Sequence, residues 1–394
     1  MSELKKIAAV VTTYYRYSHA DVIITKFLKG FPSDDGLIPP QVEVASMYMD
    51  QVHEKDVGLE LAKEHGVPVY NSIPKALTLG GGDLAVDGVL IIGEHGDYAW
   101  NEKQQHMYPR RYFFEQVCGV FATSGRSVPV FNDKHLAYDW VNSKWMYDRA
   151  RMLNVPFLAG SSVPLGWRRP YLEYNLDTPL SEALSIGYSG LDIYGFHTLE
   201  LLQCMTERRR GGETGIVAVQ CLEGDDVWRA GDEGRWSREL ADAAREPIEA
   251  KAAGEMEAHC PDPAVFLLEY ADGLKAATLM LNGYTQGFGY AGREPDRVRG
   301  MEVFLPDDPH AHFSYLGRNI HELFLTGKPP YPVERTLLVS GALDALMDSR
   351  HRGHVRVETP YLDVRYRSYE RPPIRPAGPR PSGASLVPIV PGRS

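Results

Sequence analysis

Two side chains of this sequence, Lys134 and His197, have types and positions suited to moving a proton. Lys134 follows a short apolar run that predicts a strand, and open parallel sheets bind ligands at the carboxyl ends of their strands. An ammonium group there can hydrogen-bond an alkoxide and assist proton transfer. His197, near the start of a predicted helix, can remove a proton from a hydroxyl group. We predict both as catalytic, with Asp192 to orient the histidine and Tyr194 as a second proton donor.

A second polar segment follows another predicted strand, residues 86–93, and so reaches the same edge of the sheet. It begins with Glu94 and His95, and with Asp97 it holds more ionisable side chains than a loop needs. The insert that follows, residues 100–111, is long enough to close over a substrate, and an arginine can grip a carboxylate or phosphate through paired hydrogen bonds. The predicted substrate-binding residues are Asp97, Tyr98, Arg110 and, from a later crossover, Arg168. The alternative for the whole segment is a polar surface loop.

The elements that must position these side chains alternate between strand and helix in the first half of the chain. Apolar, β-branched runs predict strands at residues 6–11, 42–49, 67–70, 86–93, 128–131 and 155–160. Helices are predicted between them, at residues 20–28, 57–64, 111–123 and 136–153. Alternation of this kind is typical of an α/β, Rossmann-like, doubly wound parallel sheet, which we assign to a domain of residues 1–160.

The pattern changes in residues 161–370, which predict an α+β domain with a mostly antiparallel open sheet. Strands are expected at residues 182–186, 215–222, 264–270, 274–282, 300–305 and 355–366, and helices at residues 196–209 and 333–350. Apolar residues in the run 274–281 predict an outer face that needs covering, and we therefore expect a homo-oligomer. The proline-rich residues 371–394 predict a tail that is either disordered or held along the surface.

The order of these motifs resembles the Gfo/Idh/MocA oxidoreductase family. Residues 130–137, with Asp133 and Lys134, resemble the family's strand-Glu-Lys-Pro motif. Residues 191–202, with Asp192 and His197, are similar to its Asp-x-Gly-x-His-x-x-Asp helix start, although the spacing is longer by one residue. Residues 269–273 resemble its sheet hairpin. The resemblance implies NAD or NADP as cofactor, bordered by Glu94 and His95, and oxidation of a sugar, polyol or sugar-derived hydroxy acid.

The turn after the first strand departs from the family pattern. The glycines that let a backbone approach a pyrophosphate are absent from residues 11–20. We predict that Arg16 supplies charge in their place, that Ser18 caps the helix N-terminus where the pyrophosphate of the cofactor would bind, and that Thr12 also lies at the cofactor. Asp50, after the second strand, lies where an acidic residue binds the adenosine ribose, and a loop or helix-capping acid is its alternative.

Composition excludes several classes of protein. Lys and Arg number 42 against 52 Asp and Glu, a formal net charge of −10, so a nucleic-acid partner is not expected. No apolar run reaches the length of a membrane span, and no signal peptide is evident. The four cysteines lack a C-x-x-C spacing, which favours a reducing cytoplasm, and no diagnostic metal motif is present, so no metal site is predicted. The alternatives to a dehydrogenase are a cofactor-free or metal-assisted lyase, hydratase or hydrolase, and a non-catalytic ligand-binding or scaffold protein.

Overall fold

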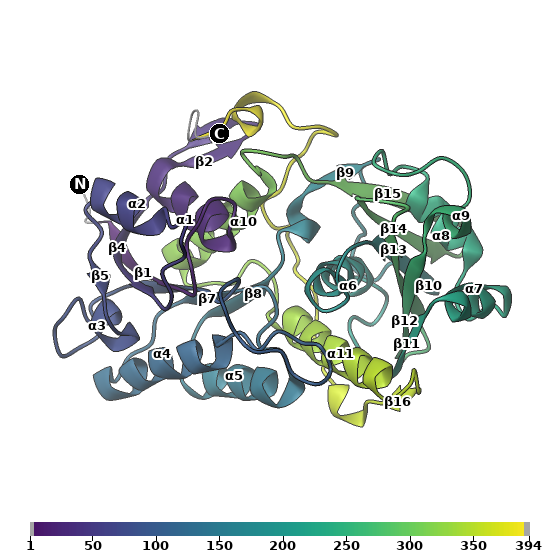
Figure 1. Cartoon of the computed structure of the whole chain (residues 1–394), viewed down its shortest axis with the longest axis horizontal. Coiled ribbons are helices and arrows are strands. Elements are labelled where there is room, and N and C mark those ends of the chain that lie inside the picture. The colour runs from purple at the N-terminus through teal and green to yellow at the C-terminus, as the bar shows by residue number, and fades with distance from the viewer. Residues whose placement is uncertain (1–3, 390–394) are drawn as a thin grey trace.

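A computed structural model describes residues 4–389 and contains two large sheets (Figure 1). The first has six parallel strands in the order β5-β4-β1-β6-β7-β8. Its strands are β1 (Lys5–Val11), β4 (Val42–Met49), β5 (Val69–Tyr70), β6 (Gly88–Ile92), β7 (Val130–Asp133) and β8 (Phe157–Gly160). The central strands β1 and β6 are almost wholly buried, as expected for a sheet covered on both faces.

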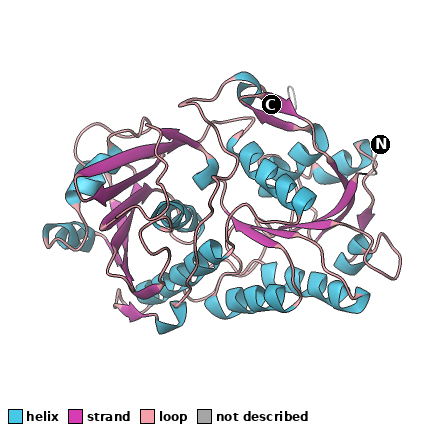
Figure 2. Cartoon of the chain, turned by 180° about the vertical axis from the view of Figure 1, so that it is seen from behind, coloured by secondary structure: helices cyan, strands magenta, loops and turns pink. Residues whose placement is uncertain are grey.

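Helices cover both faces of this sheet (Figure 2). They are α1 (His19–Lys29), α2 (Gly58–Glu64), α3 (Ile73–Leu77), α4 (Arg110–Ser124), α5 (Trp140–Met152) and α10 (His312–Thr326). The α10 helix belongs to the later part of the chain, yet it packs against α1 and against the small hairpin of β2 (Phe31–Ser33) and β3 (Gly36–Ile38). The cover of the first sheet is therefore drawn from both halves of the sequence. The prediction of a Rossmann-like sheet is confirmed.

The second sheet has eight strands in the order β16-β11-β12-β13-β10-β14-β15-β9, and only the β10–β13 pair is parallel. Its strands are β9 (Trp167–Arg169), β10 (Glu182–Gly187), β11 (Ile216–Glu223), β12 (Asp262–Tyr270), β13 (Lys275–Asn282), β14 (Phe288–Glu294), β15 (Arg297–Phe304) and β16 (Val357–Glu358). The mostly antiparallel prediction is confirmed. The last strand region, expected at 355–366, contracts to β16.

Helices α6 (Ile193–Thr206) and α11 (Glu334–His351) pack on the side of this sheet that faces the first domain (Figure 1). The opposite face is covered by α7 (Asp225–Asp232), α8 (Arg238–Arg245) and α9 (Met256–His259). Leu279 and Leu281 of β13 are buried there in one cluster with Trp236 and Leu240. The premise of the predicted homo-oligomer was therefore wrong, because the chain covers this face with its own helices.

Helix α8 lies so close to the sheet that glycine is required beneath it. A Cβ on Gly300 would meet the Ala243 carbonyl oxygen at 1.9 Å. We expect Gly300→Val to push α8 off the sheet and to lower the free energy of unfolding by about 1–3 kcal/mol or more, the usual cost of overpacking. Urea denaturation measures the loss, and light scattering should detect association through the uncovered face. Gly119→Ala, on the exposed side of α4 with open space around it, is the control and should not destabilise.

The described part of the tail, residues 371–389, follows the surface of the molecule. The Asn319 side chain exchanges hydrogen bonds with the backbone of Ile374, at 2.7 and 3.0 Å, and the Ser382 amide donates to Asp34 at 2.9 Å. These contacts agree with the surface-held alternative; residues 390–394 lie outside the described range. Three short 3-10 turns complete the fold, at Val163–Leu165, Pro360–Leu362 and Gly383–Leu386. Between residues 4 and 389 no helix has the length and apolar character needed to cross a membrane.

Candidate active site

A cavity of about 540 Å³ opens at the carboxyl edge of the first sheet, against α6 and the loop before α10. Glu94 and His95 reach it from the end of β6, and Lys134 from the end of β7. His197 reaches it from the first turns of α6. The structure thus brings together four of the predicted site residues, and Tyr194 lines the same cavity. We call this space the active-site cavity.

Glu94 is the centre of a buried charge network beneath the cavity. Lys134 Nζ donates to Glu94 Oε1 at 2.9 Å, and Arg110 Nη2 donates to Oε2. Burial alone would raise the pKa of Glu94, but Lys134 and Arg110 outweigh it and hold that pKa well below its usual range. Thr12 Oγ1 donates to the Glu94 carbonyl oxygen at 2.6 Å. The carboxylate therefore stays charged and fixes the position of the lysine ammonium.

Two residues of this network hold the backbone in the left-handed region. His95 has φ 68° and Lys134 has φ 61°, and neither is glycine. Such conformations cost free energy and cluster at functional sites, where the surrounding contacts enforce them. The Lys134 amide donates to the Gly160 carbonyl at 3.2 Å, which ties the strained turn to β8. The strain directs both side chains to the cavity rather than along the sheet.

The cavity is rich in histidines that differ in their partners. His197 Nδ1 is 2.6 Å from Ser161 Oγ, which leaves Nε2 for a ligand. Burial, with Lys134 and His19 nearby, lowers the pKa of His197 well below its usual value, so the ring is neutral at pH 7 and can accept a proton. Burial also lowers the pKa of His95, to about 4. His19 stacks 6.4 Å from the His197 ring, and its Nδ1 lies 2.6 Å from Asp133 Oδ2.

Three predicted roles are corrected. Asp192 does not orient His197: its Oδ2 accepts from the His106 amide at 3.1 Å, while Ser161 holds the histidine. Arg110 does not face a substrate, because its side chain is fully buried behind Glu94 and His135. Arg168 does not face the cleft either; it is buried and donates to the Leu172 carbonyl and to Glu173, both at 2.7 Å. All three position other groups.

Backbone amides of the turn between β1 and α1 are already hydrogen-bonded to side chains of the same segment. Ser18 Oγ accepts hydrogen bonds from the Tyr15 and Asp21 amides, at 3.2 and 3.3 Å. The Asp21 carboxylate accepts from the Tyr17 amide at 2.9 Å and adds negative charge at the helix N-terminus. A pyrophosphate needs such amides and repels such a carboxylate. These residues therefore do not fit a pyrophosphate in the position that a glycine-rich turn gives it.

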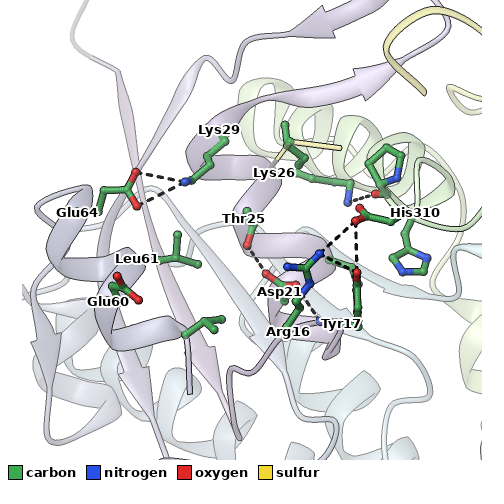
Figure 3. Close-up of a pocket in the computed structure, with 15 residues that line it drawn as sticks. Arg16, Tyr17, Asp21, Thr25, Lys26, Lys29, Glu60, Leu61, Glu64 and His310 are labelled. Carbon is green, nitrogen blue, oxygen red and sulfur yellow. Dashed lines mark hydrogen bonds and ion pairs between the residues drawn. The ribbon is translucent and has the colours of Figure 1, made fainter. Parts of the chain in front are cut away.

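Arg16 does not replace the missing glycines in this arrangement. Its Nη2 lies 3.4 Å from the Asp308 carboxylate and 2.8 Å from the Tyr17 hydroxyl. Arg16 and Tyr17 line a neighbouring pocket beside α1 and α2 (Figure 3), and its volume is about 120 Å³. The active-site cavity is lined by Tyr17 but not by Arg16. The role predicted for Arg16 in place of the glycines is thus not supported by its position.

Asp50 lies exposed after β4, where the sequence placed it. Its carboxylate accepts hydrogen bonds from the hydroxyls of Tyr48, at 2.6 Å, and Tyr98, at 2.7 Å. The Asp97 amide bonds to Gln51 Oε1 at 2.9 Å, and its side chain is exposed. Asp97 and Tyr98 therefore lie along the rim beside Asp50 rather than in the active-site cavity. In residues 4–389 no group of three or more His, Cys, Asp or Glu side chains is arranged to hold a metal ion.

The roles predicted from the sequence leave out several residues that the structure places at the cavity. His19, His310 and His312 line it, and Asp133 and Ser161 hold its histidines from behind. His19 is the first residue of α1, which follows a strand of the predicted sheet, so its position was a usable signal. His310 lies in the loop before α10 and His312 is the first residue of that helix; both are far along the chain, and no local pattern links them to this edge.

Glu200, one turn after His197 on α6, is buried with Oε2 lacking a hydrogen-bond partner. Burial raises its pKa from 4.5 to about 7. The folded state therefore keeps this proton up to about pH 7, while the unfolded chain releases it near 4.5. The contribution to stability is full below pH 4.5 and is lost as pH rises through 7.

We expect the free energy of unfolding of Glu200→Gln, whose side chain does not titrate, to increase relative to that of the wild type as pH rises. At about 1.4 kcal/mol per pKa unit, the gain in free energy of unfolding between pH 5 and pH 8 should be about 2–3 kcal/mol. Urea unfolding at the two pH values measures it, with Glu115→Gln on the exposed side of α4 as control. A difference from wild type that is the same at both pH values would refute this account of Glu200.

The fold is similar to that of several solved structures named as dehydrogenases, and the resemblance to the Gfo/Idh/MocA family is supported at the level of the fold. The structure of GenD2 from gentamicin A biosynthesis, in complex with NAD, matches with TM-score 0.57 at 15% identity over 91% of this chain and 97% of that one. A myo-inositol 2-dehydrogenase from Lactobacillus plantarum matches with TM-score 0.56 at 11% identity, over 90% and 99%.

A scyllo-inositol dehydrogenase from Lactobacillus casei, with bound NAD(H) and scyllo-inositol, matches with TM-score 0.55 at 12% identity, over 90% of this chain and 99% of that one. No family model matches the sequence, and neither does any curated protein. Identities this low carry the fold but not the activity, which has to be argued from the site.

Proposed function

We propose that this chain is an oxidoreductase that acts on a hydroxyl group of a sugar, polyol or sugar-derived hydroxy acid held in the active-site cavity. One observation carries the proposal: the charged Lys134 and the neutral His197 line the same cavity, at the sheet edge where this fold binds its ligands. The inositol dehydrogenases among the fold neighbours act on compounds of this class by name. The four cysteines are free and buried, in keeping with the cytoplasmic location that we also propose.

The chain's own residues divide the proton chemistry between them. Lys134 gives one N–H to Glu94 and keeps two for the substrate hydroxyl oxygen. In the tautomer whose Nδ1–H donates to Ser161 Oγ, His197 accepts the hydroxyl proton through Nε2. As the proton leaves, negative charge grows on the oxygen, and the ammonium group stabilises it. The Asp133–His19 pair stands beside His197 and offers a second acceptor for the proton.

The proposed hydride acceptor is NAD or NADP, and two of the fold neighbours contain NAD or NAD(H) by name. The Lys134 end of the cavity suits such a reaction. The amides of the β1–α1 turn do not suit the pyrophosphate, because Ser18 and Asp21 already use them. Binding therefore requires the dinucleotide to take another path or this turn to rearrange.

That mismatch favours a second candidate, a cofactor-free lyase or hydratase that uses the same acid–base pair. Such an enzyme moves a proton and needs no hydride acceptor. The hydrogen bonds that occupy the amides of the β1–α1 turn are therefore no obstacle to it. Lys134 and His197 keep the roles given above. The two candidates differ only in whether a dinucleotide takes part.

Calorimetric titration of NADH and NADPH into the wild type separates the two candidates. The oxidoreductase proposal expects saturable binding of one dinucleotide at or below millimolar concentration. Tyr17 and His19 line the cavity, so titrations of Tyr17→Ala and His19→Ala test whether the dinucleotide binds there. Absence of binding by either nucleotide at millimolar concentration would remove the oxidoreductase and leave the lyase or hydratase.

A further inference from the structure

A second cavity, of about 580 Å³, lies beside Trp100 and is not used in the chemistry described above. The insert after β6, the turn before α6 and the end of α11 surround it. Its lining includes Trp100, Gln104, Ser189, Asp192, Asn282 and Arg350. We call it the Trp100 groove.

Trp100 presents a fixed aromatic surface to this groove. Its side chain is 54% exposed, which is unusual for so large an apolar group. The indole stacks on His106 with centroids 4.2 Å apart and an angle of 16°, and His106 in turn packs 4.0 Å from Tyr108. The ring is therefore held in place by one face, so that it can receive a flat apolar surface at little entropic cost.

Asp192 supplies an acceptor that lacks a partner. Its side chain is only 6% exposed, its Oδ2 accepts from the His106 amide at 3.1 Å, and its Oδ1 has no hydrogen-bond partner within the described chain. Buried polar atoms are nearly always satisfied, so an orphaned carboxylate oxygen on a residue of the groove wall calls for a donor from a ligand in the groove.

The remaining charges of the groove select the kind of ligand. Three carboxylates line the groove, those of Asp192, Glu223 and Asp262. The single cation among its lining residues is Arg350, whose Nε already donates to Glu223 at 2.8 Å. An excess of carboxylates repels a phosphate or carboxylate ligand. A neutral ligand with one apolar face and several hydroxyls satisfies both the indole and the carboxylate, which is the chemistry of a sugar ring.

We propose that the Trp100 groove is a sugar-binding subsite, in which a pyranose ring stacks on Trp100 and donates a hydroxyl to Asp192 Oδ1. Ile193 lines both this groove and the active-site cavity, and the Trp100–His106–Tyr108 stack joins their walls. The substrate is therefore a disaccharide or glycoside, with its reacting ring in the active-site cavity and a second ring in the groove. This proposal names the class of substrate for the proposed function. Only the placement of the reacting ring in the active-site cavity rests on that function.

The test follows the indole N–H signals of protein labelled with ¹⁵N-tryptophan, with the Trp100 signal assigned by its loss in Trp100→Phe. The chain has six tryptophans. Cellobiose, maltose and trehalose are titrated, with glucose and myo-inositol as single-ring probes. We expect at least one disaccharide to shift the Trp100 signal and to bind about tenfold or more tightly than the single rings. Trp100→Ala and Asp192→Ala should each weaken that binding about tenfold, and Trp100→Phe should weaken it less.

Tyr112→Ala is the matched control, because Tyr112 is an aromatic residue of similar exposure, 53%, outside the groove. It should leave disaccharide binding unchanged. The proposal is overturned if no disaccharide shifts the Trp100 signal, or if the affinity survives Trp100→Ala. Neither outcome touches the proposed function, whose tests concern dinucleotide binding and the residues of the other cavity.

Discussion

Arg110→Met is expected to lower the free energy of unfolding by about 3–5 kcal/mol, the cost of leaving a buried charge without its partner. Arg110 is fully buried and donates to Glu94 Oε2 and toward His135 Nε2, 3.1 Å away. Methionine fills a similar volume but donates nothing. Glu94 would then face Lys134 alone, with one oxygen desolvated and unpaired. Urea denaturation at pH 7 measures the loss.

A triple variant separates the charge from the packing. Adding Glu94→Gln and Lys134→Met to Arg110→Met removes every charge of the network and leaves neither Glu94 nor Lys134 as a buried ion without a partner, so the triple variant should be more stable than Arg110→Met by itself. If the single variant unfolds within about 1 kcal/mol of the wild type, the network beneath the cavity does not carry the energy assigned to it.

Lys134→Met is expected to reduce turnover by about 10²–10⁴, with a smaller change in KM. The lysine ammonium meets the substrate oxygen most strongly when negative charge develops on it, so the loss falls on the chemical step. The variant also leaves Glu94 with Arg110, which keeps that carboxylate paired. Steady-state kinetics on the substrate found for the wild type provide the measurement.

Lys144→Met, an exposed lysine paired with Asp148 on α5, is the control for loss of a lysine charge and should keep full turnover. Thermal unfolding of both variants checks that they are folded. Turnover by folded Lys134→Met within a few-fold of the wild type would remove Lys134 from the chemistry and leave it as a partner of Glu94 only.

The parallel sheet could be predicted because its strands are continuous apolar runs, such as residues 6–11, that only a doubly covered sheet can bury. The cover of the second sheet could not. Helices α7 and α8 are eight residues each, too short for their periodicity to stand out in a charged segment. Without them the outer face of β13 was predicted to be exposed, and an oligomer followed from that error.

The candidate site, like the fold, could be predicted only in part. Lys134, Glu94 and His197 follow strand ends or begin a helix, so topology alone brought them to one edge. The pairing of Arg110 with Glu94 and of His19 with Asp133 joins side chains 16 and 114 residues apart, and no spacing rule indicates such contacts. An arginine is exposed by default, so its burial behind a carboxylate is visible only in the folded chain.

The most direct test of the proposed chemistry is the mass of the product that the wild type forms from a panel of inositols, monosaccharides and disaccharides, with NAD or NADP present. We predict a product lighter than its substrate by one pair of hydrogen atoms, formed with equal reduction of the dinucleotide and nearly abolished in Lys134→Met. A product that has lost water or only rearranged, formed without reduction of the dinucleotide, would contradict the oxidoreductase and identify the cofactor-free alternative.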